Sequence, residues 1–128
     1  NKISSIIYNS LDSKGEHDEI GFENDKTIII ENGIDTNKFQ KDGNARKIFC
    51  ANHNISPKKF IVGIAARNHP VKNYNLFLSS VLQALEKNSN IMCLICGTGT
   101  ENLKRKFFGG KTFKKIYESN FLFLGFLS

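Results

Sequence analysis

The sequence predicts an α/β fold in which helices cover a parallel β-sheet. Three apolar runs rich in β-branched or aromatic residues lie at 60–66, 91–96 and 121–124. The segments between these runs carry apolar residues at helical spacing, most clearly at 73–87. Strands that alternate with helices pair in parallel, because each helical crossover returns the chain to the same end of the sheet.

Size and charge set the first limits on function. The chain has 128 residues, about one domain, and its 40% apolar residues are enough to build a core. A net charge of +6 suits an anionic partner such as a phosphorylated ligand, a nucleic acid or an acidic membrane surface. The charges form no block of five like residues, so we expect no nucleic-acid tail. The basic segment 104–115 fits the solvated face of a helix equally well.

The sequence shows no apolar run long enough to cross a bilayer and no signal-peptide core. It begins with Asn1 and stops at Ser128, directly after a strand-like run. We therefore expect it to be a piece of a longer protein.

Three cysteines, Cys50, Cys93 and Cys96, raise the question of a metal or redox site. Cys93 and Cys96 lie three apart in the run 91–96, and in a strand such residues point to opposite faces. They therefore cannot share one metal ion, and buried small apolar residues are the favoured interpretation over zinc ligands. Free buried thiols indicate a reducing compartment.

The first part of the chain predicts a separate strand, helix and strand. The strands are expected at 3–8 and 27–30, and a polar helix capped by Ser10 or Asp12 is expected between them. A tight turn is predicted at Asn32-Gly33, because both residues tolerate positive φ.

Two residues beyond that turn have predicted roles. Asp35 is expected to hydrogen-bond the local backbone. Phe39 is expected to act as an apolar anchor. The polar stretch 40–44 is the best linker candidate, and a helix should follow from Asn44 to His53.

The remaining elements alternate regularly. Residues 60–66, between Pro57 and Pro70, predict a fully buried strand. A helix at 73–87 and a buried strand at 91–96 should follow. The next helix should begin at Thr100 or Glu101, break at Gly109-Gly110 and resume with Phe113 and Ile116. The last predicted strand, 121–124, ends at Gly125.

Arg67 and Lys72 are the candidate anion-binding residues. Arg67 emerges where the strand 60–66 ends, and Lys72 follows after Pro70, which fixes the turn. Ligands of open parallel sheets bind at the carboxyl ends of strands, so both cations are placed to meet an anion. A solvated basic loop is the alternative interpretation.

The second candidate is the turn Gly97-Thr98-Gly99, which follows a strand and precedes a helix. Its bare backbone would let a ligand approach the helix N-terminus. It lacks the third glycine of a dinucleotide fingerprint and the lysine of a P-loop, so a purely geometric role remains open. His69 could touch a substrate or be an ordinary turn residue. No nucleophile elbow or Ser, His and Asp triad is visible.

With these landmarks in place, the chain resembles the middle of a GT-B-type glycosyltransferase of family four (group 1 glycosyl transferases). The resemblance covers nearly the whole chain and rests on the order and spacing of several modest motifs. These are Tyr8-Asn9-Ser10, His17, Gly21-Phe22, Ile30 to Thr36 with Phe39, Arg67 to Lys72, Leu94 to Gly99, and Phe123-Leu124-Gly125.

The resemblance implies part of an enzyme with two Rossmann-like domains, each a parallel sheet with helices on both faces. Residues 1–39 would be the end of the N-terminal acceptor domain and the crossover. Residues 40–128 would be the first half of the C-terminal nucleotide-sugar-binding domain. Arg67 and Lys72 would hold the donor diphosphate. The residues implied to line the cleft are Asn32, Gly33, His69, Gly97 and Gly99.

The activity implied is retaining transfer of a sugar from a nucleotide-sugar donor to a glycan or lipid-linked acceptor, in polysaccharide synthesis. No metal and no cofactor is expected, and no catalytic residue lies in this segment. The family's paired glutamates would lie beyond Ser128, so the segment alone should be inactive. Asn73 stands where the family often has glycine. A cytoplasmic location with peripheral membrane contact on the cytoplasmic face is expected.

Two hypotheses from other classes remain. A non-catalytic nucleotide or phospho-ligand binding module would use the same crevice but lack the downstream glutamates. A nucleic-acid binder would use the segment 104–115, and its binding would weaken steeply with salt.

Overall fold

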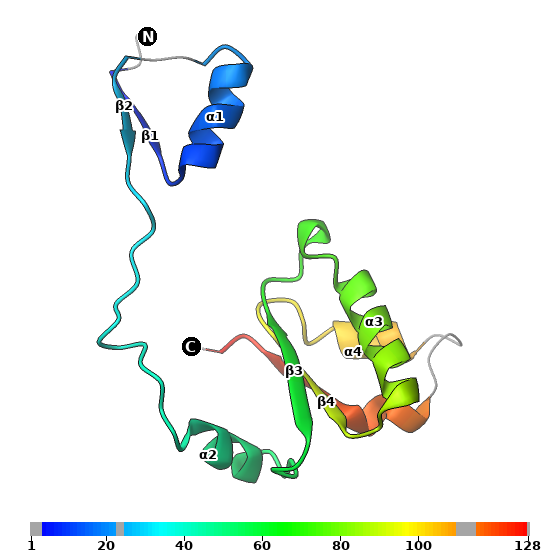
Figure 1. Ribbon diagram of the computed structural model, residues 1–128. Coiled ribbons are helices and arrows are strands. Elements are labelled where there is room, and N and C mark those ends of the chain that lie inside the picture. The colour runs from blue at the N-terminus through cyan, green and yellow to red at the C-terminus, as the bar shows by residue number, and fades with distance from the viewer. Residues whose placement is uncertain (1–3, 23–24, 110–114, 128) are drawn as a thin grey trace. The chain divides into compact units, whose positions relative to one another are not determined.

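The computed structural model describes residues 4–22, 25–109 and 115–127, and the chain divides into two compact units (Figure 1). The first unit is Asn1–Asp42 and the second unit is Gly43–Ser128. The division falls in the polar stretch 40–44 that the sequence marks as a linker. The assignment of residues 1–39 and 40–128 to acceptor and donor domains stays a prediction.

The first unit is a strand, helix and strand. The two strands, β1 (Ile6–Tyr8) and β2 (Thr27–Ile29), pair in parallel with Ile7 opposite Ile28. Between them lies α1 (Leu11–Glu19), whose first turn is capped by Ser10: its Oγ accepts a hydrogen bond from the Ser13 N–H at 3.1 Å. The predicted separate sheet is confirmed. Ile3, the expected start of the first strand, lies outside the described residues.

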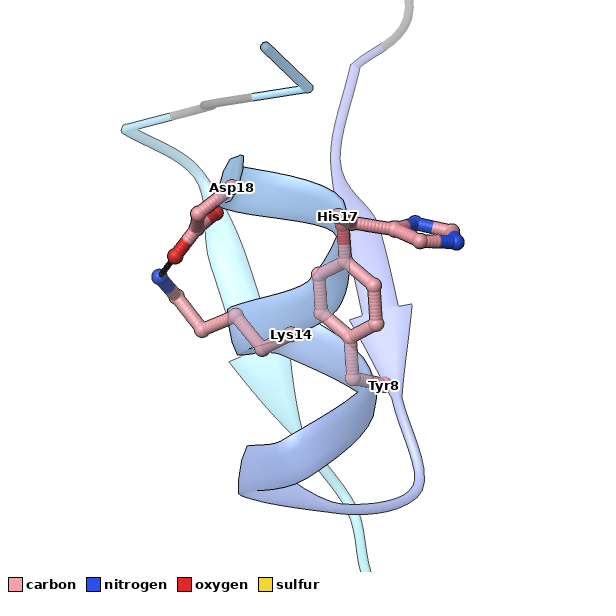
Figure 2. Close-up of polar contacts among 4 residues, drawn as sticks. All are labelled: Tyr8, Lys14, His17 and Asp18. Carbon is pink, nitrogen blue, oxygen red and sulfur yellow. Dashed lines mark hydrogen bonds and ion pairs between the residues drawn. The ribbon is translucent and has the colours of Figure 1, made fainter. Parts of the chain in front are cut away.

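Tyr8 attaches α1 to the sheet. All nine residues of α1 are described and none is buried, whereas the Tyr8 side chain is only 5% exposed. Figure 2 shows the Tyr8 hydroxyl reaching His17 of α1, with Oη 3.2 Å from Nδ1. Lys14 and Asp18 form an ion pair elsewhere on the helix. The helix is therefore held by aromatic and polar contacts rather than by an apolar stripe.

The prediction of a tight turn at Asn32-Gly33 is wrong. Neither residue adopts a positive φ, and the turn lies at residues 36–38. Asp35 explains the position: its Oδ1 accepts hydrogen bonds from the N–H groups of Asn37 (3.0 Å) and Lys38 (3.1 Å), which confirms its predicted local role. The prediction that Phe39 acts as an apolar anchor is also wrong, because its side chain is 69% exposed. The Lys38 Nζ lies 5.6 Å from the centroid of the Phe39 ring.

The second unit contains a three-stranded parallel sheet in the order β3–β4–β5. Its strands are β3 (Phe60–Ala65), β4 (Ile91–Cys96) and β5 (Phe121–Gly125). Its helices are α2 (Ala45–Asn52), α3 (Tyr74–Lys87) and α4 (Leu103–Phe108), with 3-10 turns η1 (Pro70–Lys72) and η2 (Lys115–Asn120).

Helices cover both faces of this sheet, as predicted (Figure 1). On one face, α3 and α4 pack against the sheet in a core that includes Leu78, Leu85 and Ile95, each at most 1% exposed. On the other face, Cys50 of α2 packs with Met92. The predicted apolar side of the helix at 73–87 therefore contributes to the larger core through Val81 and Leu85. Leu76, expected on the same side, is instead 62% exposed.

β3 is less buried than the sequence predicts. It lies at one edge of the sheet that the described residues form, and the Phe60 side chain is 65% exposed. α2 covers the sheet beside Ile61 but leaves Ala65 exposed. The buried strand is β4, because it has a partner on each side and a helix layer on each face.

The last predicted helix is two elements. α4 begins at Leu103, because Thr100 first forms a turn in which its N–H and Oγ1 both bond to the Gly97 carbonyl. It ends at Gly109, where a Cβ would overlap the Arg105 carbonyl oxygen. The chain resumes in η2 as a 3-10 turn. Phe113 lies outside the described residues.

Candidate functional site

The carboxyl ends of β3 and β4 are joined beyond the last paired residues. The Ala66 N–H donates to the Cys96 carbonyl at 3.0 Å, and the Asn68 N–H donates to the Thr98 carbonyl at 2.8 Å. The Asn68 side-chain amide adds a bond to the Gly99 carbonyl at 3.2 Å. The loop that carries Arg67 is therefore held beside the glycine turn, as expected for neighbouring parallel strands.

The glycines of this turn have geometric reasons to be glycine. Gly97 and Gly99 adopt φ values of 128° and 80°, a region that other residues rarely enter. A Cβ on Gly97 would also overlap the Ala66 carbonyl oxygen. The Gly97 N–H donates to the Gly125 carbonyl at 2.6 Å, so the turn also contacts the end of β5. Close packing and the positive φ are therefore sufficient to explain why residue 97 is glycine, without a role in ligand binding.

Arg67 and Gly97 line one cavity of about 240 Å³. Its lining comes from the ends of all three strands, namely Ala65, Ala66, Arg67, Cys96, Gly97, Thr98, Phe126 and Leu127. It thus combines one guanidinium, a bare backbone turn and two apolar side chains after β5. The sequence singled out the first two features and missed Phe126 and Leu127, which carry no motif.

Lys72 ends the short turn η1, five residues after Arg67. Pro70 occupies the first turn of η1, and the Lys72 N–H donates to the His69 carbonyl at 2.9 Å. The side chains of Arg67 and Lys72 are exposed and make no hydrogen bond or ion pair with the described residues. Both charges are therefore available to a ligand. Their convergence on one diphosphate stays a prediction.

His69 has a structural task in the loop. Its Nδ1 accepts a hydrogen bond from the Val71 N–H at 3.4 Å and so caps η1. The residue lines a separate cavity of about 280 Å³ that also includes Asn73 and Lys106. The structure therefore does not place His69 in the lining of the Arg67 cavity, and the turn-residue interpretation explains its contacts.

Asn32 and Gly33 lie in the exposed segment after β2, in the first unit. Arg67, Lys72 and the glycine turn belong to the second unit. The predicted role of Asn32 and Gly33 as cleft lining stays a prediction.

Two residues at the start of α3 were not assigned a site role from the sequence. Asn73 adopts φ 45° and caps α3, its Oδ1 accepting from the Leu76 N–H at 3.3 Å. The signal for it was present, since glycine is frequent at this position in the family that the chain resembles. Tyr74 is only 4% exposed, and its hydroxyl donates to the Ala66 carbonyl at 2.5 Å. No spacing in the sequence predicts this bond.

The cysteines behave as packing residues where the structure describes them. All three are free, and Cys93 is fully buried, which raises the pKa of its thiol to about 12. A protonated thiol is a poor metal ligand. Within the described ranges, no three His, Cys, Asp or Glu residues gather in a way that could hold a metal ion.

Among the described helices, none has the length and apolar character required to cross a bilayer.

The two parallel sheets with their flanking helices are a partial Rossmann-like arrangement of the GT-B type, so the predicted fold class is confirmed. The solved structures that share it include HepE of Anabaena. Its complex with UDP and glucose and its complex with UDP-glucose each match 98% of this chain, with a TM-score of 0.77 and 21% sequence identity. This chain spans about a third of HepE, 33% and 34% in the two structures. No family model matches the sequence, and no curated protein matches it.

Proposed function

We propose that the chain is part of a GT-B glycosyltransferase and that its second unit binds the diphosphate of a nucleotide-sugar donor through Arg67 and Lys72. The observation that carries the proposal is the cavity at the carboxyl ends of the strands, where Arg67 lies with Gly97 and Thr98. The fold it shares with HepE, a protein crystallised with UDP and with UDP-glucose, supports the same ligand class.

The chemistry of glycosyl transfer favours cations near the donor diphosphate. Arg67 lines the cavity, and Lys72 lies five residues further on, outside the cavity lining but in the same loop. When the sugar leaves its donor, the nucleoside diphosphate that departs gathers negative charge. Fixed positive groups facing that charge stabilise the transition state more than the ground state, so they accelerate the reaction. Arg67 and Lys72 can do this without a metal ion, and we expect none to be required.

The finer features of the activity follow from the resemblance to family four. We propose a retaining reaction with a glycan or lipid-linked acceptor, on the cytoplasmic side of a membrane that the protein contacts peripherally. Catalytic groups are expected outside this segment, so the 128-residue chain should bind donor nucleotide without transferring sugar.

UDP binding to the ¹⁵N-labelled chain, followed by NMR, tests the proposal. Backbone amides of Arg67, Gly97 and Thr98 should shift, and Arg67→Ala should weaken binding by about tenfold or more, the usual loss for a charged hydrogen bond. Lys72→Ala should also weaken it.

The matched control is Arg105→Ala. Arg105 is an exposed arginine of α4 that lines a different cavity, so the variant removes the same charge elsewhere. It should leave UDP affinity within twofold. Equal losses for Arg67→Ala and Arg105→Ala would show that net charge alone attracts the nucleotide and would refute the assigned site.

A further inference from the structure

Tyr74 lies where the two strand ends that flank the cavity come together. Its hydroxyl donates to the Ala66 carbonyl at 2.5 Å and lies 3.5 Å from the Cys96 carbonyl. Ala66 directly precedes Arg67, and Cys96 directly precedes Gly97. The Tyr74 hydroxyl therefore contacts the backbone immediately before Arg67 and immediately before Gly97, at two residues that themselves line the cavity.

The Tyr74 ring and the Tyr74 hydroxyl have separable roles. The ring belongs to the main core, with Leu78 and Ile95. The hydroxyl lies at the edge of this core and contacts the loop that follows β3, at the Ala66 carbonyl. Burial, with a smaller contribution from Cys96, raises the pKa of Tyr74, so the hydroxyl keeps its proton at neutral pH and remains a donor.

Asn68 makes the second side-chain link between the same two loops. Its amide donates to the Gly99 carbonyl at 3.2 Å, and its own backbone N–H donates to Thr98. Arg67 thus lies between two anchored residues, Ala66 and Asn68. The backbone that carries the exposed Arg67 guanidinium is therefore fixed on both sides. Because this backbone is already ordered, less conformational entropy is lost when Arg67 binds an anion.

We infer that Tyr74, acting with Asn68, is a positioning residue that holds Arg67 against the glycine turn for binding of a nucleoside diphosphate. The inference rests on the proposed function. Tyr74 does not line the Arg67 cavity, so we expect no direct contact with the nucleotide. Its effect on affinity should therefore operate entirely through Arg67.

The test is a double-mutant cycle on UDP affinity, measured by NMR titration of the 128-residue chain. Tyr74→Phe keeps the ring and removes the hydroxyl, and it should weaken UDP binding about fivefold, the scale of one lost hydrogen bond. In the Arg67→Ala background the same change should alter affinity by less than twofold, because the residue it positions is gone.

Tyr8→Phe is the matched control. Tyr8 is a buried tyrosine in the first unit, 5% exposed, whose hydroxyl is 3.2 Å from His17 Nδ1. The control variant also removes one buried tyrosine hydroxyl, yet it should leave UDP affinity unchanged. If Tyr74→Phe fails to fold by its NMR spectrum, Asn68→Ala enters the same cycle with the same expectation.

The outcomes separate the inference from the proposed function. If Arg67→Ala weakens UDP binding but Tyr74→Phe has no effect, or the same effect in both backgrounds, the positioning role is wrong and the binding site stands. If Arg67→Ala itself has no effect, both are wrong.

Discussion

The carbonyl oxygen of Ala66 occupies the space that a side chain on Gly97 would need. The two residues come from neighbouring strands, and their contact holds the loop after β3 against the turn after β4. This close packing makes the geometry of the candidate site sensitive to one added methyl group.

Gly97→Ala should therefore destabilise the second unit by about 2–4 kcal/mol, because it combines a steric overlap with φ 128°. Urea unfolding measures the loss. Gly43→Ala is the control: nothing in the described residues lies within 4 Å of its added Cβ, and its stability should change by less than about 1 kcal/mol. Similar losses at both positions would contradict the packing described for the turn.

Asn73 gives a prediction about the start of α3. Asn73→Ala should cost about 1–3 kcal/mol, because alanine loses the cap to Leu76 and is strained at φ 45°. Asn73→Gly should cost only a few tenths, because glycine accepts this φ without strain and substitutes well at a cap. Chemical denaturation of both variants checks the order, and an Asn73→Gly chain less stable than Asn73→Ala would be inconsistent with the left-handed backbone.

The sequence predicted the elements better than their environments. Periodicity placed α3 and β4 almost to the residue, because each carries a strong apolar pattern. It misjudged β3, since an apolar run does not reveal whether a strand has neighbours on both sides. It placed a turn at Asn32-Gly33 from local propensity, whereas the carboxylate of Asp35 fixes the turn later in the chain.

The candidate site likewise contains residues that the sequence could predict and residues that it could not. Arg67 could be proposed as a site residue because it follows the predicted strand 60–66, and the glycine turn because of its composition. The sequence could not single out Tyr74, Phe126 and Leu127, because their positions at the candidate site depend on contacts between segments distant in sequence.

Cys93 gives a prediction about pH. Its thiol has a pKa raised by burial from 9.0 to about 12, so the folded state favours the protonated form. The stability linked to Cys93 should be fully present below pH 9 and should be lost as pH rises from about 9 to 12. The unfolding free energy of the native chain should then fall more steeply over this range than that of Cys93→Ala. Parallel curves for the two chains would mean that the thiol is not shielded from water.

α1 offers a prediction for the first unit. Gly15 lies in this helix, and in the described residues nothing lies within 4 Å of an added Cβ. Gly15→Ala should stabilise the helix by about 0.5–1 kcal/mol, because alanine loses less backbone entropy. Thermal unfolding followed by circular dichroism measures the gain, and a loss would indicate that α1 is not helical at Gly15.

The central claim is that Arg67 and Lys72 converge on one diphosphate at the carboxyl ends of β3 and β4. A crystal structure of the chain with UDP tests it most directly. We expect the diphosphate oxygens at about 2.7–3.2 Å from both the Arg67 guanidinium and the Lys72 ammonium, beside Gly97 and Thr98. A diphosphate bound elsewhere, or one held by neither cation, would contradict the claim.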